Sequence, residues 1–324
     1  MTPLELADSA VRSAVSLPPL AGRSVTVIGP TREAARCVTT LQAVGADGRV
    51  EPVETRVDLT ADALIVVTVE SGLRARAVVA AREAGVPILG DLDVAWLASG
   101  SEAFAVTGGA RAGHAALLTA ALLAAHDRSV IVLGDQTTGP ACEADVMVVE
   151  PSLDQLSAIQ VFRPRLAVIM RGAAPASVRL MSHQMACDCL VLTDDADLRS
   201  LARMSRAPVV WLSTEHPLDH GVYVADDRIA ARLNGHVEQI CPVAGMPAPE
   251  LEATLAAVAC GLWAGLDPAR IGELLVRRSA VDRQRPDRAR TPEGAVLSSP
   301  SLTGARTLAA RARAMLSVVA GSVW

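Results

Sequence analysis

The chain has 324 residues, of which 51% are hydrophobic and 20% charged, and its net charge is −5. At roughly 100–200 residues per domain this length predicts two or three domains, and the apolar content excludes a disordered chain. The negative charge and an aromatic content of only 2% argue against a nucleic-acid partner, because such partners need basic surfaces and stacking platforms.

All 30 basic residues are arginines, since the sequence contains no lysine. A Schiff-base lysine, a phosphate-loop lysine and a carbamylated lysine are therefore excluded from this sequence. Six cysteines without a CxxC pair predict reduced, mostly buried thiols in a cytoplasmic protein.

Two observations argue against a membrane or secretory location. The N-terminus carries Glu5 and Asp8 before any apolar run, which is not the pattern of a signal peptide. The longest run poor in polar residues, 115–125, is too short to cross a bilayer. We expect a cytoplasmic protein without a membrane partner.

The first 100 residues alternate strand and helix patterns. Apolar runs that end in turn residues predict strands, and runs of helical spacing that stop at glycine predict helices. This alternation predicts a Rossmann-like α/β domain over residues 1–100, with strands at 24–29, 63–68 and 86–90 and helices at 31–44 and 74–84.

A second α/β domain is predicted over residues 101–290. It begins with a strand at 103–107, a glycine-rich turn and an alanine-rich helix at 114–125. Further strands are predicted at 130–133, 146–149, 166–170, 189–193 and 209–212, a hairpin at 221–224 and 228–233, helices at 251–262 and 268–277, and a polar linker at 279–294.

Residues 291–324 are too few for an independent domain. They contain a basic amphipathic helix over 306–316, which is either a packed surface helix or a docking surface for an acidic partner. An incomplete domain would leave a sheet edge uncovered, and such edges are usually paired. We therefore expect a homodimer or a protein partner.

Three segments in order carry a resemblance to a known family: Ala84–Trp96, Ala105–Gly109 and Val149–Leu156. In order and spacing they resemble the Mur ligases of peptidoglycan synthesis, and within that family its D-glutamate-adding members. The resemblance implies a domain that binds the uridine diphosphate end of the substrate, then an ATPase domain. Of the third domain, which binds the amino acid, it implies only a remnant over residues 291–324.

The same resemblance predicts a degenerate ligase site. The family's phosphate loop, TGxNGK(S/T)(T/S), corresponds to Thr107–His114, where Ala112 stands at the lysine position and Gly113 or His114 at the metal-binding hydroxyl. Only Glu150 matches a metal-binding residue of the family. Four more elements lack the family's residues, namely the carbamylated lysine near 180–183 and the segments Arg171–Pro175, Gly245–Ala248 and Pro300–Ala305.

Some residues keep the capacity to bind an anion. Glycines at a helix N-terminus offer backbone N–H groups to phosphates, so the binding candidates are Gly108, Gly109 and Gly113 together with Gly29, Thr31 and Arg32 after the first strand. The ligand would be a UDP-muramyl-type or other anionic small molecule, and no cofactor is expected.

No metal site is expected either. The segment His216–His220 holds two histidines and an aspartate, but Pro217 predicts a solvated loop. His183, Cys187 and Cys189 have no metal-ligand spacing and are interpreted as part of a helix that leads into a strand, with buried thiols.

Three functions stay open. The leading one is a protein that has lost amide-ligase chemistry and acts in binding or protein interaction, in cell-wall or specialised metabolism. The second is an enzyme with a rebuilt site in the old cleft, with Arg111, His114 and Glu150 as the catalytic candidates. The third is a divergent ligase that works through substituted contacts.

Overall fold

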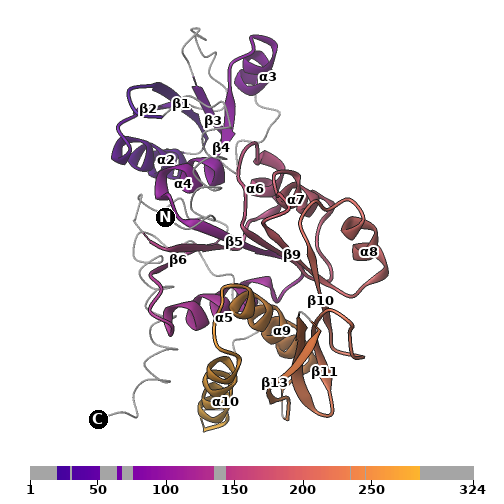
Figure 1. Ribbon diagram of the computed structural model, residues 1–324. Helices are drawn as coiled ribbons and strands as arrows, with labels where there is room; N and C mark the ends of the chain where they lie inside the picture. The colour runs from indigo at the N-terminus through magenta and orange to yellow at the C-terminus, as the bar shows by residue number, and fades with distance from the viewer. Residues whose placement is uncertain are drawn as a thin grey trace, which may run out of the picture. The chain divides into compact units, whose positions relative to one another are not determined.

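The computed structural model describes residues 20–29, 31–51, 64–67, 76–134, 144–233, 235–244 and 246–284. Within this part the chain forms two compact units (Figure 1). The first comprises the described residues up to Ala98 together with Ala158–Phe162, and the second comprises Ser99–Ser157 and those from Arg163 onward. The predicted remnant at 291–324, with its helix over 306–316, lies outside the described residues.

The first unit is a parallel sheet of four strands in the order β2-β1-β3-β4. Val25, Val27 and Ile28 of β1 are fully buried, as expected for a parallel strand that is covered on both faces. The elements are β1 (Ser24–Ile28), α2 (Thr31–Ala43), β2 (Asp47–Glu51), β3 (Leu64–Val67), α3 (Arg76–Glu83), β4 (Ile88–Gly90) and α4 (Asp91–Ser99).

Sequence patterns alone do not reveal two of these elements. The strand β2 reads Asp-Gly-Arg-Val-Glu and lies at the edge of the sheet, where a polar strand remains partly exposed. The helix α4 is buried along most of its length, so it lacks the polar face that marks an amphipathic helix.

A buried carboxylate ties Ala158–Phe162 into the first unit. Asp93 is fully buried and accepts backbone N–H groups of Gly90 (2.8 Å), Gln160 (3.0 Å), Val161 (3.0 Å) and Phe162 (2.7 Å). Burial raises the pKa of Asp93 and outweighs the opposite effect of these donors. The rings of Phe162 and Trp96 also pack in a T-shaped arrangement, with centroids 5.9 Å apart. The Asp91–Trp96 motif therefore has a structural role here.

The second unit is a nine-stranded sheet in the order β13-β12-β11-β10-β9-β8-β5-β7-β6, parallel from β6 to β11 and antiparallel from β11 to β13. Its strands are β5 (Glu102–Thr107), β6 (Val130–Leu133), β7 (Val146–Val149), β8 (Leu166–Ile169), β9 (Cys189–Thr193), β10 (Val209–Ser213), β11 (Gly221–Ala225), β12 (Arg228–Leu233) and β13 (His236–Pro242).

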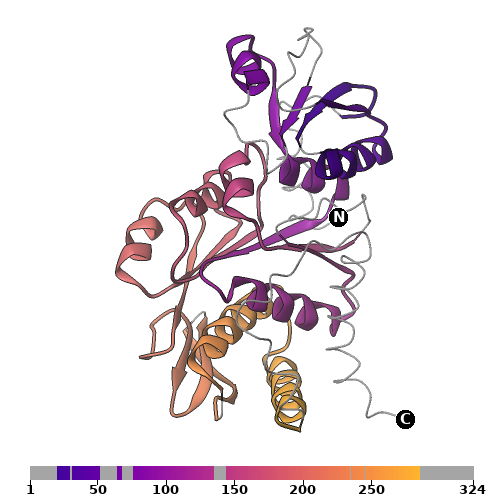
Figure 2. The same cartoon turned by 180° about the vertical axis from the view of Figure 1, so that it is seen from behind.

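Helices cover the faces of this sheet. Two of them, α5 and α9, lie side by side on one face (Figure 2). Both helices bury small side chains in the core, and these are Ala115, Ala116, Ala253, Ala256 and Ala257. The helices are α5 (Ala112–Ala124), α6 (Leu153–Ala158), the 3₁₀ turn η2 (Pro175–Val178), α7 (Arg179–Ser182), α8 (Ala196–Ala202), α9 (Ala248–Trp263) and α10 (Pro268–Gln284).

The predicted α/β class is confirmed, with one local correction. The linker predicted from residue 279 is wrong for residues 279–284, because α10 continues to Gln284. Arginine, alanine and glutamine are good helix formers, so a polar, arginine-rich sequence is compatible with a surface helix. Within the described residues, no helix combines the length and apolarity needed to cross a membrane.

Candidate functional site

The topology of the second unit points to one edge of its sheet. The connection after β5 leads to β6 on one side, whereas the connection after β8 leads to β9 on the other. In open α/β sheets, ligands bind at the carboxyl ends of strands where such a reversal occurs. The turn Gly108–Arg111 follows β5 at this edge, and Arg171 follows β8.

The two glycines that begin this turn pack against the end of β8. Gly108 has a φ of +128°, and a Cβ there would lie 2.7 Å from both the Cβ and the carbonyl oxygen of Met170. The N–H of Gly109 donates to the carbonyl of Arg171 at 3.1 Å. Packing against Met170 thus requires glycine at position 108, and the N–H of Gly109 is paired within the protein.

A carboxylate lies against the first turn of α5. Glu150 directly follows β7, and an added Cβ on Gly113 would lie 2.5 Å from its Oε2. Negative charge at a helix N-terminus is favourable, because the N–H groups there have no partner within the helix. The carboxylate of Glu150 therefore lies beside the N-terminus of α5. Arg111, the residue before α5, is exposed, and its side chain makes no capping hydrogen bond to that helix.

His114 meets a residue far along the chain. Its Nε2 lies 3.0 Å from Nη2 of Arg278 on α10, and Nη2 of Arg278 also lies 3.9 Å from Glu250. Arginine is always a donor, so this ring nitrogen accepts and the imidazole is neutral. Burial, then the charges of Arg278 and Arg111, lower the pKa of His114 to about 4. His114 thus offers no positive charge to a phosphate at neutral pH.

A pocket of about 240 Å³ lies at the carboxyl ends of β8, β9 and β10, beside the first turns of α9. Oε1 of Glu252 accepts the hydroxyl of Thr193 at 2.8 Å and the N–H of Arg171 at 3.4 Å. The guanidinium of Arg171 is half exposed and lies 3.7 Å from Glu215. The pocket is lined by Arg171, Thr193, Leu212, Thr214, Ala248, Glu252 and Leu255.

Sequence reasoning did not identify this pocket. Its polar residues belong to separate segments, and none of these segments has a motif for a known ligand. The available signal was positional, because Arg171, Thr193 and Thr214 each lie at or just after the end of a predicted parallel strand.

Ser213, His216 and Asp194 form a hydrogen-bonded series near the pocket. His216 places Nε2 3.0 Å from Asp194 and Nδ1 3.3 Å from the Ser213 hydroxyl. The Ser213 oxygen also accepts the N–H groups of Glu215 and His216 at 3.2 and 3.1 Å and is buried. A hydroxyl committed to two backbone donors stabilises a turn and is a poor nucleophile.

The remaining predicted residues are placed as follows. Gly29 follows β1, and α2 begins at Thr31, but the side chains of Thr31 and Arg32 are outside the described part. No group of three or more His, Cys, Asp or Glu side chains able to hold a metal ion occurs among the residues that the structure describes.

The sequence is similar to curated D-glutamate-adding ligases. It is 27% identical over 227 residues to the UDP-N-acetylmuramoylalanine--D-glutamate ligase of Koribacter versatilis, covering 63% of this chain and 50% of that protein. It is 30% identical over 241 residues to the ligase of that name from Pelotomaculum thermopropionicum, covering 67% and 53%. This chain is a relative of the Mur ligases. It spans about half the length of these curated relatives.

Other comparisons add less. No family model matches the chain. A solved structure of a UDP-N-acetylmuramate:L-alanyl-gamma-D-glutamyl-meso-diaminopimelate ligase from Neisseria meningitides is 14% identical, with a TM-score of 0.49, and covers 78% of this chain and 97% of that one.

The resemblance to the Mur ligases assigns ligase roles to the β5–α5 turn. Ala112, at the position of the family's lysine, is buried at the start of α5. Gly113, at the position of the first hydroxyl residue, has no side chain, and the carboxylate of Glu150 lies against it. The turn brings Glu150 beside Gly113 and places His114 against Arg278. Of the three catalytic candidates, Arg111 acts on His114, because its charge contributes to the lowered pKa of the imidazole.

Proposed function

We propose that this Mur ligase relative has lost ATP-dependent amide-ligase chemistry and acts as a binding or interaction protein in cell-wall or specialised metabolism. The observation that carries the proposal is the phosphate-loop-like turn after β5, which has Ala112 in place of the family's lysine and Gly113 in place of its hydroxyl residue.

Each change in this turn disfavours the binding of ATP and the transfer of its phosphoryl group. A phosphate loop needs free N–H groups, a lysine on the β- and γ-phosphates and a hydroxyl on Mg²⁺. Here the lysine and the hydroxyl are replaced by Ala112 and Gly113, so Glu150, which matches a metal-binding residue of the family, has neither of these two partners beside it. Phosphoryl transfer depends on stabilising the developing charge, and a neutral His114 contributes little to this.

The pocket at β8–β10 is the proposed binding site of the second unit. Arg171 offers a half-exposed guanidinium for an anionic group, while Thr193 and Glu252 provide polar contacts beside the apolar Leu212 and Leu255. The names of the curated relatives suggest the ligand class, a UDP-muramyl molecule or another small anion. A retained anion site at Gly29, Thr31 and Arg32 is the matching proposal for the first unit.

Isothermal titration of the full chain with Mg-ATP, and separately with UDP-N-acetylmuramoyl-alanine, tests the proposal. We expect no heat from Mg-ATP and saturable heat from the UDP ligand. Saturable Mg-ATP binding near micromolar would overturn the loss of ligase chemistry. The absence of heat with both ligands would overturn the proposed binding of a UDP-muramyl molecule.

A loop variant provides the matched control for the ATP titration. Ala112→Lys combined with Gly113→Thr restores the family pattern at the two positions, and the carboxylate of Glu150 must then move away from the new Cβ. If these two positions account for the loss, the variant binds Mg-ATP and the natural chain does not. Equal binding by both proteins would show that the two substitutions do not govern ATP binding.

A further inference from the structure

A charged cluster in the second unit contains Cys187, which has no role in the sites described above. Arg163 donates from Nε and Nη2 to the two carboxylate oxygens of Asp188 at 2.7 and 2.8 Å, and Arg165 donates to Oδ1 at 2.9 Å. The side chains of Arg163, Arg165 and Asp188 are at most 2% exposed. These pairs join the segment before β8 to the segment before β9.

The sulfur of Cys187 lies against both arginines. Nη2 of Arg163 is 3.3 Å from Sγ and Nη1 of Arg165 is 3.4 Å from it, while the Asp188 carboxylate lies at 3.9 Å. Two guanidiniums and one carboxylate give these three side chains a net charge of +1. Anionic sulfur beside them would make the cluster neutral.

Arg165 provides an independent sign that the cluster can hold another group. Its side chain is buried, its Nη1 is directed at the sulfur, and its Nε has no hydrogen-bond partner among the described residues. The guanidinium also lies over the ring of Trp263, 5.9 Å from its centroid, which keeps it in place. A buried donor without an acceptor carries a cost, and Nη1 of the same guanidinium faces the sulfur.

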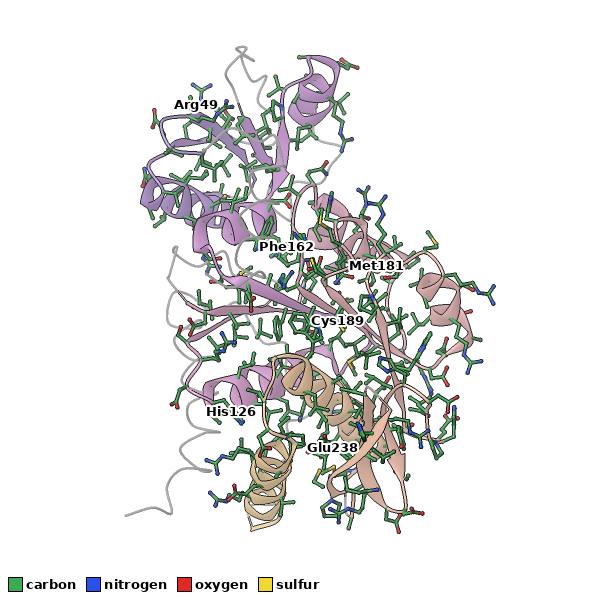
Figure 3. The ribbon with its side chains drawn as sticks, viewed as in Figure 1. Arg49, His126, Phe162, Met181, Cys189 and Glu238 are labelled. Atoms are coloured by element: carbon green, nitrogen blue, oxygen red, sulfur yellow. The ribbon has the colours of Figure 1, made fainter. Side chains whose placement is uncertain are left out.

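Cys187 differs from the other described cysteines in its exposure. It is exposed, whereas Cys37, Cys189, Cys241 and Cys260 are buried. Burial raises the pKa of Cys189 and Cys260 to about 12, so these two thiols stay neutral and unreactive. Figure 3 labels Cys189, which lies two residues after Cys187 at the start of β9. The sequence-based interpretation of buried thiols is therefore wrong for Cys187.

We infer that Cys187 is a site of oxidation by hydroperoxides, with Arg163 and Arg165 holding its sulfur. The thiolate sulfur attacks one peroxide oxygen, so that an S–O bond forms and the O–O bond breaks. The leaving hydroxide takes a proton from solvent and becomes water when the oxidant is hydrogen peroxide. The sulfur loses two electrons to the peroxide, and the product is a sulfenic acid. Exposed thiolates in electropositive surroundings undergo this chemistry selectively.

The test is the rate of sulfenic-acid formation in the full chain. The reduced protein is treated with hydrogen peroxide at pH 7, trapped with dimedone at successive times, and mapped by peptide mass spectrometry. Mapping separates Cys187 from Cys142, which lies outside the described residues. We expect Cys187 to be labelled first. Labelling that is spread evenly over the cysteines, or absent at Cys187, would overturn the inference.

A transplanted thiol serves as the control for exposure. Cys187→Ser combined with Leu153→Cys places a thiol at a position that is 55% exposed and next to the acidic Asp154. The natural Cys187 should react about tenfold faster than this thiol if the arginines activate it. Equal rates would mean that exposure alone sets the reactivity.

The arginine contribution is measured separately with Arg165→Gln. This variant should slow labelling of Cys187 several-fold while circular dichroism remains that of the natural chain. An unchanged rate in the folded variant contradicts a role for Arg165. If the variant does not fold, the comparison with the transplanted thiol still decides the inference.

Discussion

Two regions at the carboxyl edge of the same sheet are built in opposite ways. At the β5–α5 turn, Gly108 is packed against Met170 and Gly113 against the carboxylate of Glu150. At β8–β10, the side chains leave a pocket of about 240 Å³. Topology places a ligand site along such an edge, but the volume and charge of the side chains decide which part of the edge accepts a ligand. In this Mur ligase relative the filled part is the one that resembles a phosphate loop.

The filled region should be the more sensitive to added volume. Gly108→Ala combines a φ of +128° with a Cβ that lies 2.7 Å from backbone and side-chain atoms of Met170. We expect a loss of about 3 kcal/mol or more in the free energy of unfolding, measured with urea. Gly109→Ala is the control, since its Cβ meets only the Arg171 carbonyl at 3.2 Å. Equal losses in the two variants would contradict this account of the turn.

The β5–α5 region should also contribute less to the free energy of unfolding at acidic pH. His114 has a folded-state pKa of about 4 against 6.5 ordinarily, so the unfolded chain binds the extra proton between these values. The free energy of unfolding should therefore fall as the pH drops through this range. After allowance for partial exposure, we expect about 1–2 kcal/mol from His114 between pH 7.5 and 5. His114→Gln, whose amide oxygen can still accept from Arg278, should lose less over that interval. Identical pH dependence in both proteins would refute this assignment.

The pocket at β8–β10 should accept a larger side chain without a loss of stability, but its ligand should then bind more weakly. Ala248 is exposed and lines the pocket, so Ala248→Phe fills it without disturbing the core. We expect binding of the UDP ligand to weaken about tenfold or more, equal to about 1.4 kcal/mol, with an unchanged urea midpoint. Ala244→Phe, also exposed but not part of the lining, is the matched control. A similar loss in both variants would place the ligand elsewhere.

Much of the architecture is predictable from local pattern. Strands such as Leu64–Val67 and Val146–Val149 are apolar throughout, and the hairpin turn at Asp226 and Asp227 has positive φ values of 50° and 55°, which aspartate tolerates. Such patterns do not predict the edge strands β2 and β13 or the buried helix α4. Their environment depends on neighbours that are remote in sequence.

The sequence by itself determined the α/β class, the relation to the Mur ligases and the absence of a lysine, because periodicity, motif order and composition are properties of the chain alone. Only the tertiary structure decided that Glu150 lies against Gly113, that Arg278 meets His114 across 164 positions, and that Arg163 and Arg165 flank Cys187. These contacts join residues on different elements. Their distances depend on strand order and helix packing, which local patterns do not encode.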